Sequence, residues 1–311
     1  MAFQETDISW RILRRIVREW RGPAAELDEV KPLVGGCINT TLALHASDGA
    51  RAVLKITAHR VNRQFLREAH QLRMLRELGL PAPKVLAVHI ADLEEPNSYL
   101  LMEFVEGVNL AAARQLCGPA EFDAIQEHLA ELVSALHAHT APAYRREGDD
   151  DREQFDAWPD FYRHVYEPIW RDVERSPQIP GKLKKQIARV HERLDRLLAH
   201  DDCPRLTHWD IWSSNILVRP DSAGRWRVAA LLDPNCKYAH AEAELAYMEL
   251  FHTVTPAFLR AYRHTHHLGD GYHKLRKHIY QLYPLINHVH LFGHDYVRPL
   301  AAVVERVARL V

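Results

Sequence analysis

The sequence predicts an α+β protein of two lobes: a small N-terminal lobe built on an antiparallel sheet with one inserted helix, and a larger, mainly helical C-terminal lobe. The chain has 311 residues, and a typical domain has about 150, so two lobes are expected. Short apolar runs separated by turn residues dominate up to residue 106, whereas helical periodicity dominates from residue 107 onward. We therefore divide the chain into residues 1–106 and 107–311.

The composition is that of an ordinary globular protein. Hydrophobic residues make up 47% of the chain and charged residues 26%, which excludes disordered, collagenous and disulfide-scaffold classes. Forty basic residues against 41 acidic ones give a net charge of −1 with His neutral, so neither nucleic acid nor an anionic membrane is an expected partner. Residues 1–10 carry no apolar signal segment, and the four Cys form no CxxC pair. We expect a cytoplasmic protein.

Apolar spacing predicts the elements of the N-terminal lobe. Ile8, Ile12, Ile16 and Trp20 recur at helical spacing. A turn signal, Ser47-Asp48-Gly49, separates two short apolar runs and predicts a hairpin. The expected elements are a helix with Asp7 as N-cap, strands at 42–44 and 52–56, a helix that stops at Gly79, and strands at 85–90 and 99–105.

The C-terminal lobe reads as helices interrupted by short strands. An amphipathic stripe runs through residues 122–136, and the chain is helical again from Glu242 to Val311. Strand-like pieces lie at 205–208, 215–218 and 226–232. We expect core packing for a cluster of aromatic residues at roughly helical spacing, and the alternative is a face that stacks on a sugar. The cluster comprises Phe155, Trp158, Phe161, Tyr162, Tyr166 and Trp170.

Three segments carry residues that phosphoryl transfer requires. His208-x-Asp210 is followed by Asn215, and Asp233 ends an apolar strand 18 residues further on. Lys55 ends the Ala-Val-Leu-Lys strand, and Glu68 lies on the next helix. Each residue alone is common in a structural role. Together they occur in kinase order, each on the element that kinase chemistry requires.

Their chemistry assigns each a role. A carboxylate must orient the attacking hydroxyl and accept its proton, which suits Asp210. Oxygen ligands must hold Mg²⁺, which prefers hard donors and retains waters, and this suits Asn215 and Asp233. A cation must position the phosphates of ATP, which suits Lys55 held by Glu68.

The segment from His208 to Asn215 is similar to the H-G-D-L-x-x-x-N loop of aminoglycoside phosphotransferase-like kinases. It resembles more closely the H-G-D-L-W-S-G-N loop of the fructosamine (ketosamine) kinases. Three further segments resemble that family: its glycine-rich loop at 35–39, its D-P-A-x-Y-x-G-H-x-E-x-D-L-A segment at 233–246, and its C-terminal N-H-x-x-x-F-G helix at 280–293. The resemblance covers roughly residues 30 to 300 of this chain.

The resemblance implies a bilobal protein-kinase-like fold and an enzyme that uses ATP and Mg²⁺ to phosphorylate a sugar hydroxyl of a ketosamine, free or protein-bound. Gly35 and Gly36 would let the loop backbone approach the phosphates. Glu103 and Val105 would present the backbone C=O and N–H that read adenine. His208 would brace the catalytic loop. We expect a monomer or a weak dimer.

Departures from the family pattern concern the acceptor. Trp209 replaces the Gly of H-G-D, and Asn235 replaces the Ala after D-P. Either these residues reshape the acceptor pocket or the loop tolerates their size, and both interpretations stay open. The expected acceptor contacts are Trp209, Trp212, Asn235 and His288.

Two other functions remain as alternatives. One is an aminoglycoside phosphotransferase-like kinase acting on an antibiotic, an amino sugar or another secondary metabolite. The other is a non-catalytic pseudokinase that serves as a binding module. The presence of Lys55, Glu68, Asp210, Asn215 and Asp233 favours an enzyme.

Overall fold

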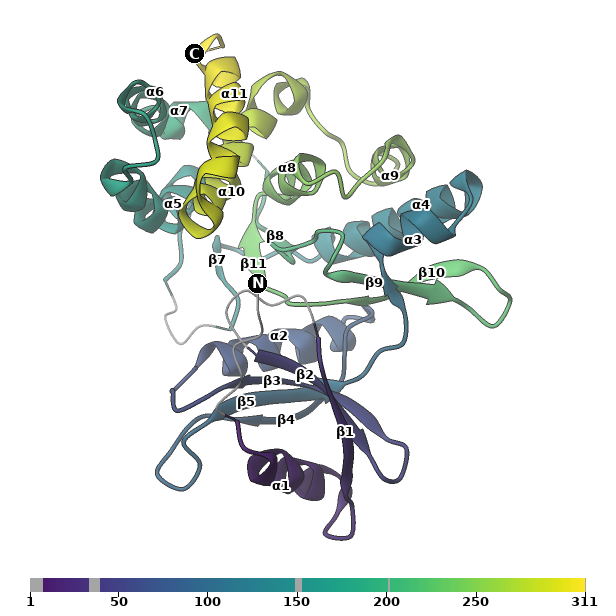
Figure 1. Cartoon of the computed structure of the whole chain (residues 1–311). Coiled ribbons are helices and arrows are strands. Elements are labelled where there is room, and N and C mark those ends of the chain that lie inside the picture. Colours follow the sequence, from purple (N-terminus) through teal and green to yellow (C-terminus); the bar gives the residue numbers. More distant parts are fainter. Residues whose placement is uncertain (1–7, 34–39, 149–152, 201, 311) are drawn as a thin grey trace. The chain divides into compact units, whose positions relative to one another are not determined.

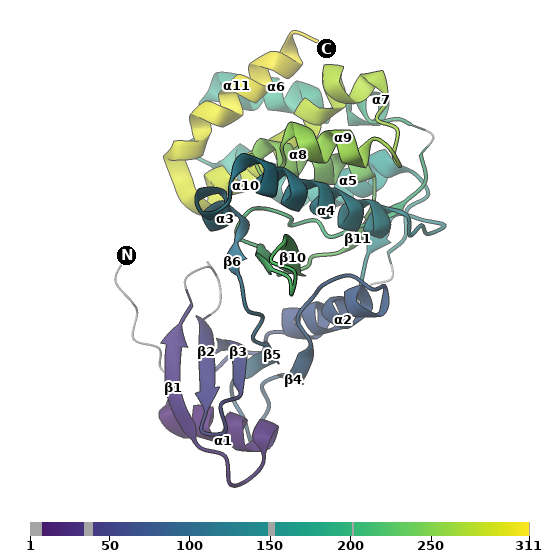
Figure 2. The same ribbon diagram turned by 90° about the vertical axis from the view of Figure 1, so that its right-hand side faces the viewer.

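The chain forms two compact units in a computed structural model that describes residues 8–33, 40–148, 153–200 and 202–310. The first unit comprises Met1–Ala112 and Ile216–Pro234, and the second comprises Ala113–Asn215 and Asn235–Val311. Figures 1 and 2 trace the chain in two views. The predicted α+β class is confirmed. Residues 216–234 belong to the first unit, although they lie in the second half of the sequence.

A five-stranded antiparallel sheet forms the frame of the first unit. Its order is β1-β2-β3-β5-β4, with bounds Leu27–Pro32, Thr40–Ala46, Arg51–Thr57, Ser98–Glu103 and Val85–His89 in that order. The predicted hairpin is β2–β3, and the two later strands agree with the prediction to within two residues. β1 was not predicted because its sequence, Leu-Asp-Glu-Val-Lys-Pro, buries only Leu27 and shows no apolar alternation.

The sheet lies between two helices, α1 (Trp10–Arg21) and α2 (Gln64–Glu77) (Figures 1 and 2). Leu54 and Ile56 of β3 join the core cluster that also contains buried residues of α1. Successive strand side chains point to opposite faces, so Lys55 points to the face that α2 covers. Ser9 precedes α1 as its N-cap residue, whereas Asp7 lies outside the described residues.

A second, three-stranded sheet completes the first unit. Its order is β10-β9-β6, with bounds Trp226–Leu231, Ile216–Pro220 and Val108–Asn109. Gly107, at the predicted boundary between the two lobes, has φ 152°, and a Cβ atom there would lie 2.8 Å from the carbonyl oxygen of Val218. Only glycine therefore allows β6 to approach β9 at this point.

Helices dominate the second unit, together with a small sheet of order β7-β11-β8. Its strands are Arg145–Arg146, Lys237–Ala239 and Arg205–Thr207. α4 packs against α9, and α10 packs against α5, α8 and α11. The helices are α3 (Leu110–Leu116, begun in the first unit), α4 (Pro119–His137), α5 (Trp158–Arg175), α6 (Gly181–His191), α7 (Leu194–Leu197), α8 (Ala241–Leu250), α9 (Pro256–Tyr262), a short π-helix at Tyr272–Arg276, α10 (Lys277–Phe292), a short 3₁₀-helix at Gly293–Tyr296, and α11 (Val297–Ala308).

Aromatic side chains on α5 fill the core of this unit. Trp158, Phe161, Tyr162 and Tyr166 are each at most 4% exposed, so these four rings serve packing and present no open face to a sugar. Within the described part of the chain, no helix combines the length and the apolar character that a membrane crossing needs.

Candidate active site

Lys55 lies between two carboxylates of the first unit. Its Nζ atom is 2.5 Å from Oε1 of Glu68 and 2.5 Å from Oδ1 of Asp233. β3 supplies the lysine, α2 supplies the glutamate, and the segment after β10 supplies the aspartate. The structure thus brings together three of the residues that the sequence singled out.

The charge of Lys55 is held by its two partners. The side chain is almost fully buried, and burial alone would lower the pKa of its ammonium group. The carboxylates of Glu68 and Asp233 outweigh this effect and raise the pKa of Lys55 above its usual value. The lysine therefore remains a cation at neutral pH, as a phosphate-binding group must.

Asp233 has an unusual backbone conformation. Its φ of 56° lies in the left-handed region, which aspartate tolerates better than most residues. Oδ1 accepts the hydrogen bond from Lys55, and 39% of the side chain is exposed. A partly exposed carboxylate is the kind of hard oxygen donor that Mg²⁺ prefers, so Asp233 fits its predicted place in a metal site.

The predicted nucleotide contacts are only partly described. Glu103 is the last residue of β5, and its backbone N–H donates to the carbonyl of Lys84 at 2.8 Å. Its carboxylate accepts from the Lys84 N–H at 3.0 Å. Of the two backbone groups of Glu103, the N–H is therefore occupied, and the C=O is the group that could read adenine as predicted. Val105 lies just beyond the strand. Gly35 and Gly36 lie outside the described residues.

Asp210, in the second unit, accepts hydrogen bonds at both carboxylate oxygens. The side-chain amide of Asn215 donates to Oδ2 at 2.9 Å and to the Asp210 carbonyl at 3.1 Å. The hydroxyl of Tyr247 donates to Oδ1 at 2.6 Å. Because the amide nitrogen of Asn215 faces Asp210, its amide oxygen is the atom suited to a metal ion.

Trp209, next to Asp210, is held in a strained conformation. Its φ is 68°, a region that costs a residue with a Cβ atom about 1–2 kcal/mol. The Trp209 N–H donates to Oε1 of Glu244 on α8. Oε2 of Glu244 lies 2.8 Å from Nε2 of His137, whose Nδ1 lies 2.7 Å from the hydroxyl of Tyr262. This buried chain of contacts fixes the backbone beside Asp210.

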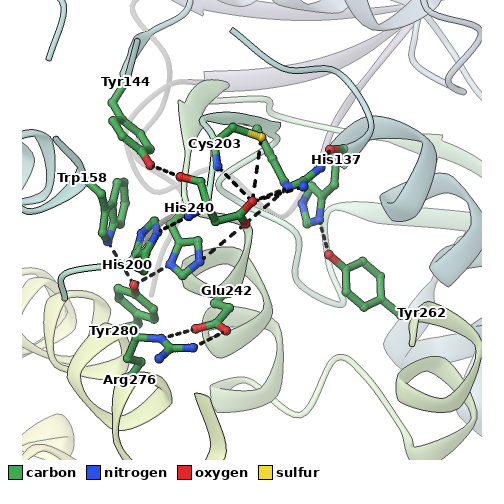
Figure 3. A network of polar contacts seen from close by, with 12 residues as sticks. His137, Tyr144, Trp158, His200, Cys203, His240, Glu242, Tyr262, Arg276 and Tyr280 are labelled. Carbon is green, nitrogen blue, oxygen red and sulfur yellow. Dashed lines mark hydrogen bonds and ion pairs between the residues drawn. The ribbon is translucent and has the colours of Figure 1, made fainter. Parts of the chain in front are cut away.

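A second buried row of polar contacts supports the same unit. The Trp158 indole donates to the Tyr280 hydroxyl at 3.0 Å, and that hydroxyl is 2.7 Å from Nδ1 of His240. The rings of His240 and His200 stack with centroids 3.7 Å apart. Figure 3 shows this row together with the pairs His137–Tyr262 and Glu242–Arg276.

The ring of Trp209 packs inside the second unit. It meets Trp158 edge-on with centroids 6.4 Å apart. The Nζ atom of Lys237 lies 4.8 Å from its centroid, within the range of a cation–π contact. The ring is half-buried, so part of it remains accessible to a ligand.

The other predicted acceptor residues differ in their surroundings. The carbonyl of Trp212 accepts from the Asn215 N–H at 2.9 Å, and the backbone N–H of Asn235 donates to the carbonyl of His208 at 3.0 Å. The Asn235 side chain is exposed, and Trp212 is half-buried. His208 is fully buried.

His288 lies in an aromatic cluster. Its Nδ1 is 2.7 Å from the carbonyl of Pro284, and its ring packs against Phe251, Phe292 and Tyr296 at 4.8–5.2 Å. Burial lowers the pKa of His288, which favours a neutral ring.

Sequence reasoning missed Tyr247 and the His137–Glu244 pair. Tyr247 directly follows the matched segment 233–246 and lies one helical turn after Glu244. That i, i+3 spacing on a predicted helix, with both side chains on one face, is the signal that could have found it.

Comparison with known proteins assigns the chain to a family. The family model described as "Fructosamine kinase" matches residues 9–309. A probable ketoamine kinase of Enterococcus faecium is 28% identical over 89% of this chain and 94% of its own length. The rice Protein-ribulosamine 3-kinase, chloroplastic (Oryza sativa subsp. indica), is 24% identical over 94% of this chain and 84% of its own.

Solved structures share the fold. A putative fructosamine-3-kinase from Haemophilus somnus 129PT matches with a TM-score of 0.76 and 19% identity, covering 96% of this chain and 97% of that chain. The aminoglycoside phosphotransferase APH(4)-Ia, in a ternary complex with AMP-PNP and hygromycin B, matches with a TM-score of 0.68 and 19% identity over 96% and 98% of the two chains.

Proposed function

Because the chain belongs to the fructosamine kinase family, it is an ATP-dependent phosphotransferase acting on hydroxyl groups, and we propose that its acceptor is a sugar hydroxyl of a fructosamine- or ribulosamine-type ketosamine. The observation that carries this proposal is the doubly hydrogen-bonded carboxylate of Asp210 within a chain that matches the family from residue 9 to residue 309. The proposal includes protein-bound ketosamines, since a plant relative is named for ribulosamines on proteins.

In the proposed reaction, Asp210 is the proton acceptor. The acceptor hydroxyl oxygen forms a bond to the γ-phosphorus of ATP, while the bond from that phosphorus to the β,γ-bridging oxygen breaks and ADP leaves. The hydroxyl proton passes to the carboxylate of Asp210. Asn215 and Tyr247 donate hydrogen bonds to that carboxylate.

Lys55 and the two proposed metal ligands serve the donor. Lys55, held as a cation by Glu68, would bind the α- and β-phosphates. Asn215 and Asp233 would hold Mg²⁺, which when bound neutralises charge on the phosphates. The backbones of Glu103 and Val105 would read adenine, and Gly35 and Gly36 would approach the phosphates. Residues 1–106 would thus be the ATP-binding lobe.

The acceptor site would lie in residues 107–311. Trp209, Trp212, Asn235 and His288 are its proposed contacts, and the half-buried ring of Trp209 beside Asp210 supports that assignment. We propose a cytoplasmic location. We expect a monomer or a weak dimer.

The test is ATP consumption by purified protein with Mg²⁺. Fructosyl-lysine and ribulosyl-lysine are compared with a panel of aminoglycosides, since APH(4)-Ia shares the fold. Turnover that depends on a ketosamine supports the proposal. Turnover that depends only on an aminoglycoside assigns the chain to the alternative acceptor class. ATP binding without turnover on any acceptor favours a binding module.

A further inference from the structure

Tyr247 contacts the proposed proton acceptor from a distant part of the chain. Its hydroxyl donates to Oδ1 of Asp210 at 2.6 Å, across 37 positions of sequence. Burial, and then the neighbouring carboxylate of Asp210, raise the pKa of Tyr247. The phenol therefore keeps its proton at neutral pH and acts as a donor.

Two donors to Asp210 come from different elements. Asn215, in the same loop as Asp210, binds Oδ2, whereas Tyr247, on α8, binds Oδ1. Donors on opposite oxygens fix the plane of the carboxylate.

α8 reaches the loop at two points one helical turn apart. Glu244 accepts from the backbone of Trp209, and Tyr247 binds the side chain of Asp210. The ring of Tyr247 packs edge-on against Phe251 one turn further along, with centroids 4.8 Å apart, and Phe251 packs against His288. The ring of Tyr247 is thus held by its packing against Phe251, which is not one of the proposed phosphate-binding residues.

We propose that Tyr247 is a positioning residue for Asp210, one that orients the carboxylate toward the acceptor hydroxyl. This inference rests on the proposed function. Loss of the Tyr247 hydroxyl should release the carboxylate from its fixed plane, and small misplacements of a catalytic group are costly in rate.

The experiment compares Tyr247→Phe with Tyr272→Phe. Tyr272 is a matched control because it too donates to a carboxylate, Glu249, at the same distance of 2.6 Å. In Tyr247→Phe we expect kcat to fall about 10- to 100-fold with the KM for ATP unchanged. Tyr272→Phe should leave both kcat and the KM for ATP at their wild-type values. An unchanged kcat in Tyr247→Phe would contradict the inference.

A second readout needs no acceptor. The NMR signal of the Asp210 carboxyl carbon is recorded at neutral pH in protein labelled with ¹³C-aspartate, and it is assigned by its loss in Asp210→Asn. A changed chemical shift in Tyr247→Phe, with no change in Tyr272→Phe, supports the inference even if ketosamines are not substrates of the wild-type enzyme. An unchanged chemical shift in Tyr247→Phe overturns the inference, even if the enzyme proves to be a ketosamine kinase.

Discussion

The backbone N–H of Trp209 donates to the buried carboxylate of Glu244, and this contact holds a tryptophan at φ 68° beside the proposed proton acceptor. The fructosamine kinase motif that this segment resembles has glycine here, the residue best suited to a positive φ. The half-buried ring packs against Trp158 and Lys237. Side-chain packing therefore accompanies a backbone conformation that is unfavourable for tryptophan.

Two substitutions at Trp209 separate the backbone strain from the packing. Both Trp209→Ala and Trp209→Gly lose the ring, but only alanine keeps a Cβ atom in the left-handed region. We expect Trp209→Gly to be more stable than Trp209→Ala by about 1 kcal/mol, the reverse of the usual order within helices and strands. Denaturant unfolding measures the difference, and an alanine variant at least as stable as the glycine variant contradicts this account of the strain.

Removal of the Glu244 carboxylate should destabilise the loop more than neutralising it does. Glu244→Ala leaves the Trp209 N–H and the Nε2 of His137 buried without this partner, at a cost of about 2–4 kcal/mol. Glu244→Gln retains an oxygen for Trp209, and His137 can change its tautomer. Thermal and denaturant unfolding should rank the stabilities as wild type, then Gln, then Ala. Equal stability of the two variants would show that these contacts contribute nothing.

Asp233→Asn should weaken the use of Mg²⁺. The substitution removes the charge of a proposed metal ligand, so the Mg²⁺ concentration for half-maximal turnover should rise about tenfold or more. Asp48→Asn is the control, because Asp48 is an exposed aspartate of the same unit that pairs with Arg21. If Asp233→Asn and Asp48→Asn show the same Mg²⁺ dependence as wild type, Asp233 is not a metal ligand.

His240 should make the protein less stable in mild acid. Burial, together with the neighbouring His200 and Arg276, lowers the pKa of His240 well below its usual value. In the unfolded chain the pKa is about 6.5, so below that pH the unfolded state binds a proton that the folded state does not. The free energy of unfolding should then fall by up to about 1.4 kcal/mol per pH unit from this residue.

The check is the slope of unfolding free energy against pH between about 6.5 and 5. His240→Gln should flatten the slope, whereas His290→Gln, at an exposed position, should not. Identical slopes in wild type and His240→Gln would rule out this contribution.

Local sequence patterns predicted the parts of the fold whose signal is local. The hairpin β2–β3 and the helix α2 follow from a turn signal and from apolar spacing, and both lie close to their expected bounds. β9 and β10 lie where strand-like pieces were predicted, at 215–218 and 226–232. Their sheet with β6 did not follow, because β6 is only two residues long and meets β9 across more than a hundred positions. Pairing over that separation leaves no periodic trace in the sequence.

In the candidate site, too, the contacts that follow from the order of the elements were predicted, whereas those that depend on packing were not. Lys55, Glu68 and Asp233 were assigned from the order of their elements, and both carboxylates contact the lysine. Tyr247 was missed because its contact with Asp210 depends on how α8 packs against the loop. Packing also placed the ring of Trp209 on Trp158 and Lys237, which no spacing in the sequence predicts.

The most direct test of the account is the turnover of Asp210→Asn on a ketosamine, measured beside its binding of ATP with Mg²⁺. We predict that ATP binding stays close to that of wild type, while kcat falls by at least about 10²-fold, as expected for loss of the proton acceptor. An Asp210→Asn enzyme that phosphorylates the ketosamine as fast as wild type would contradict the central claim.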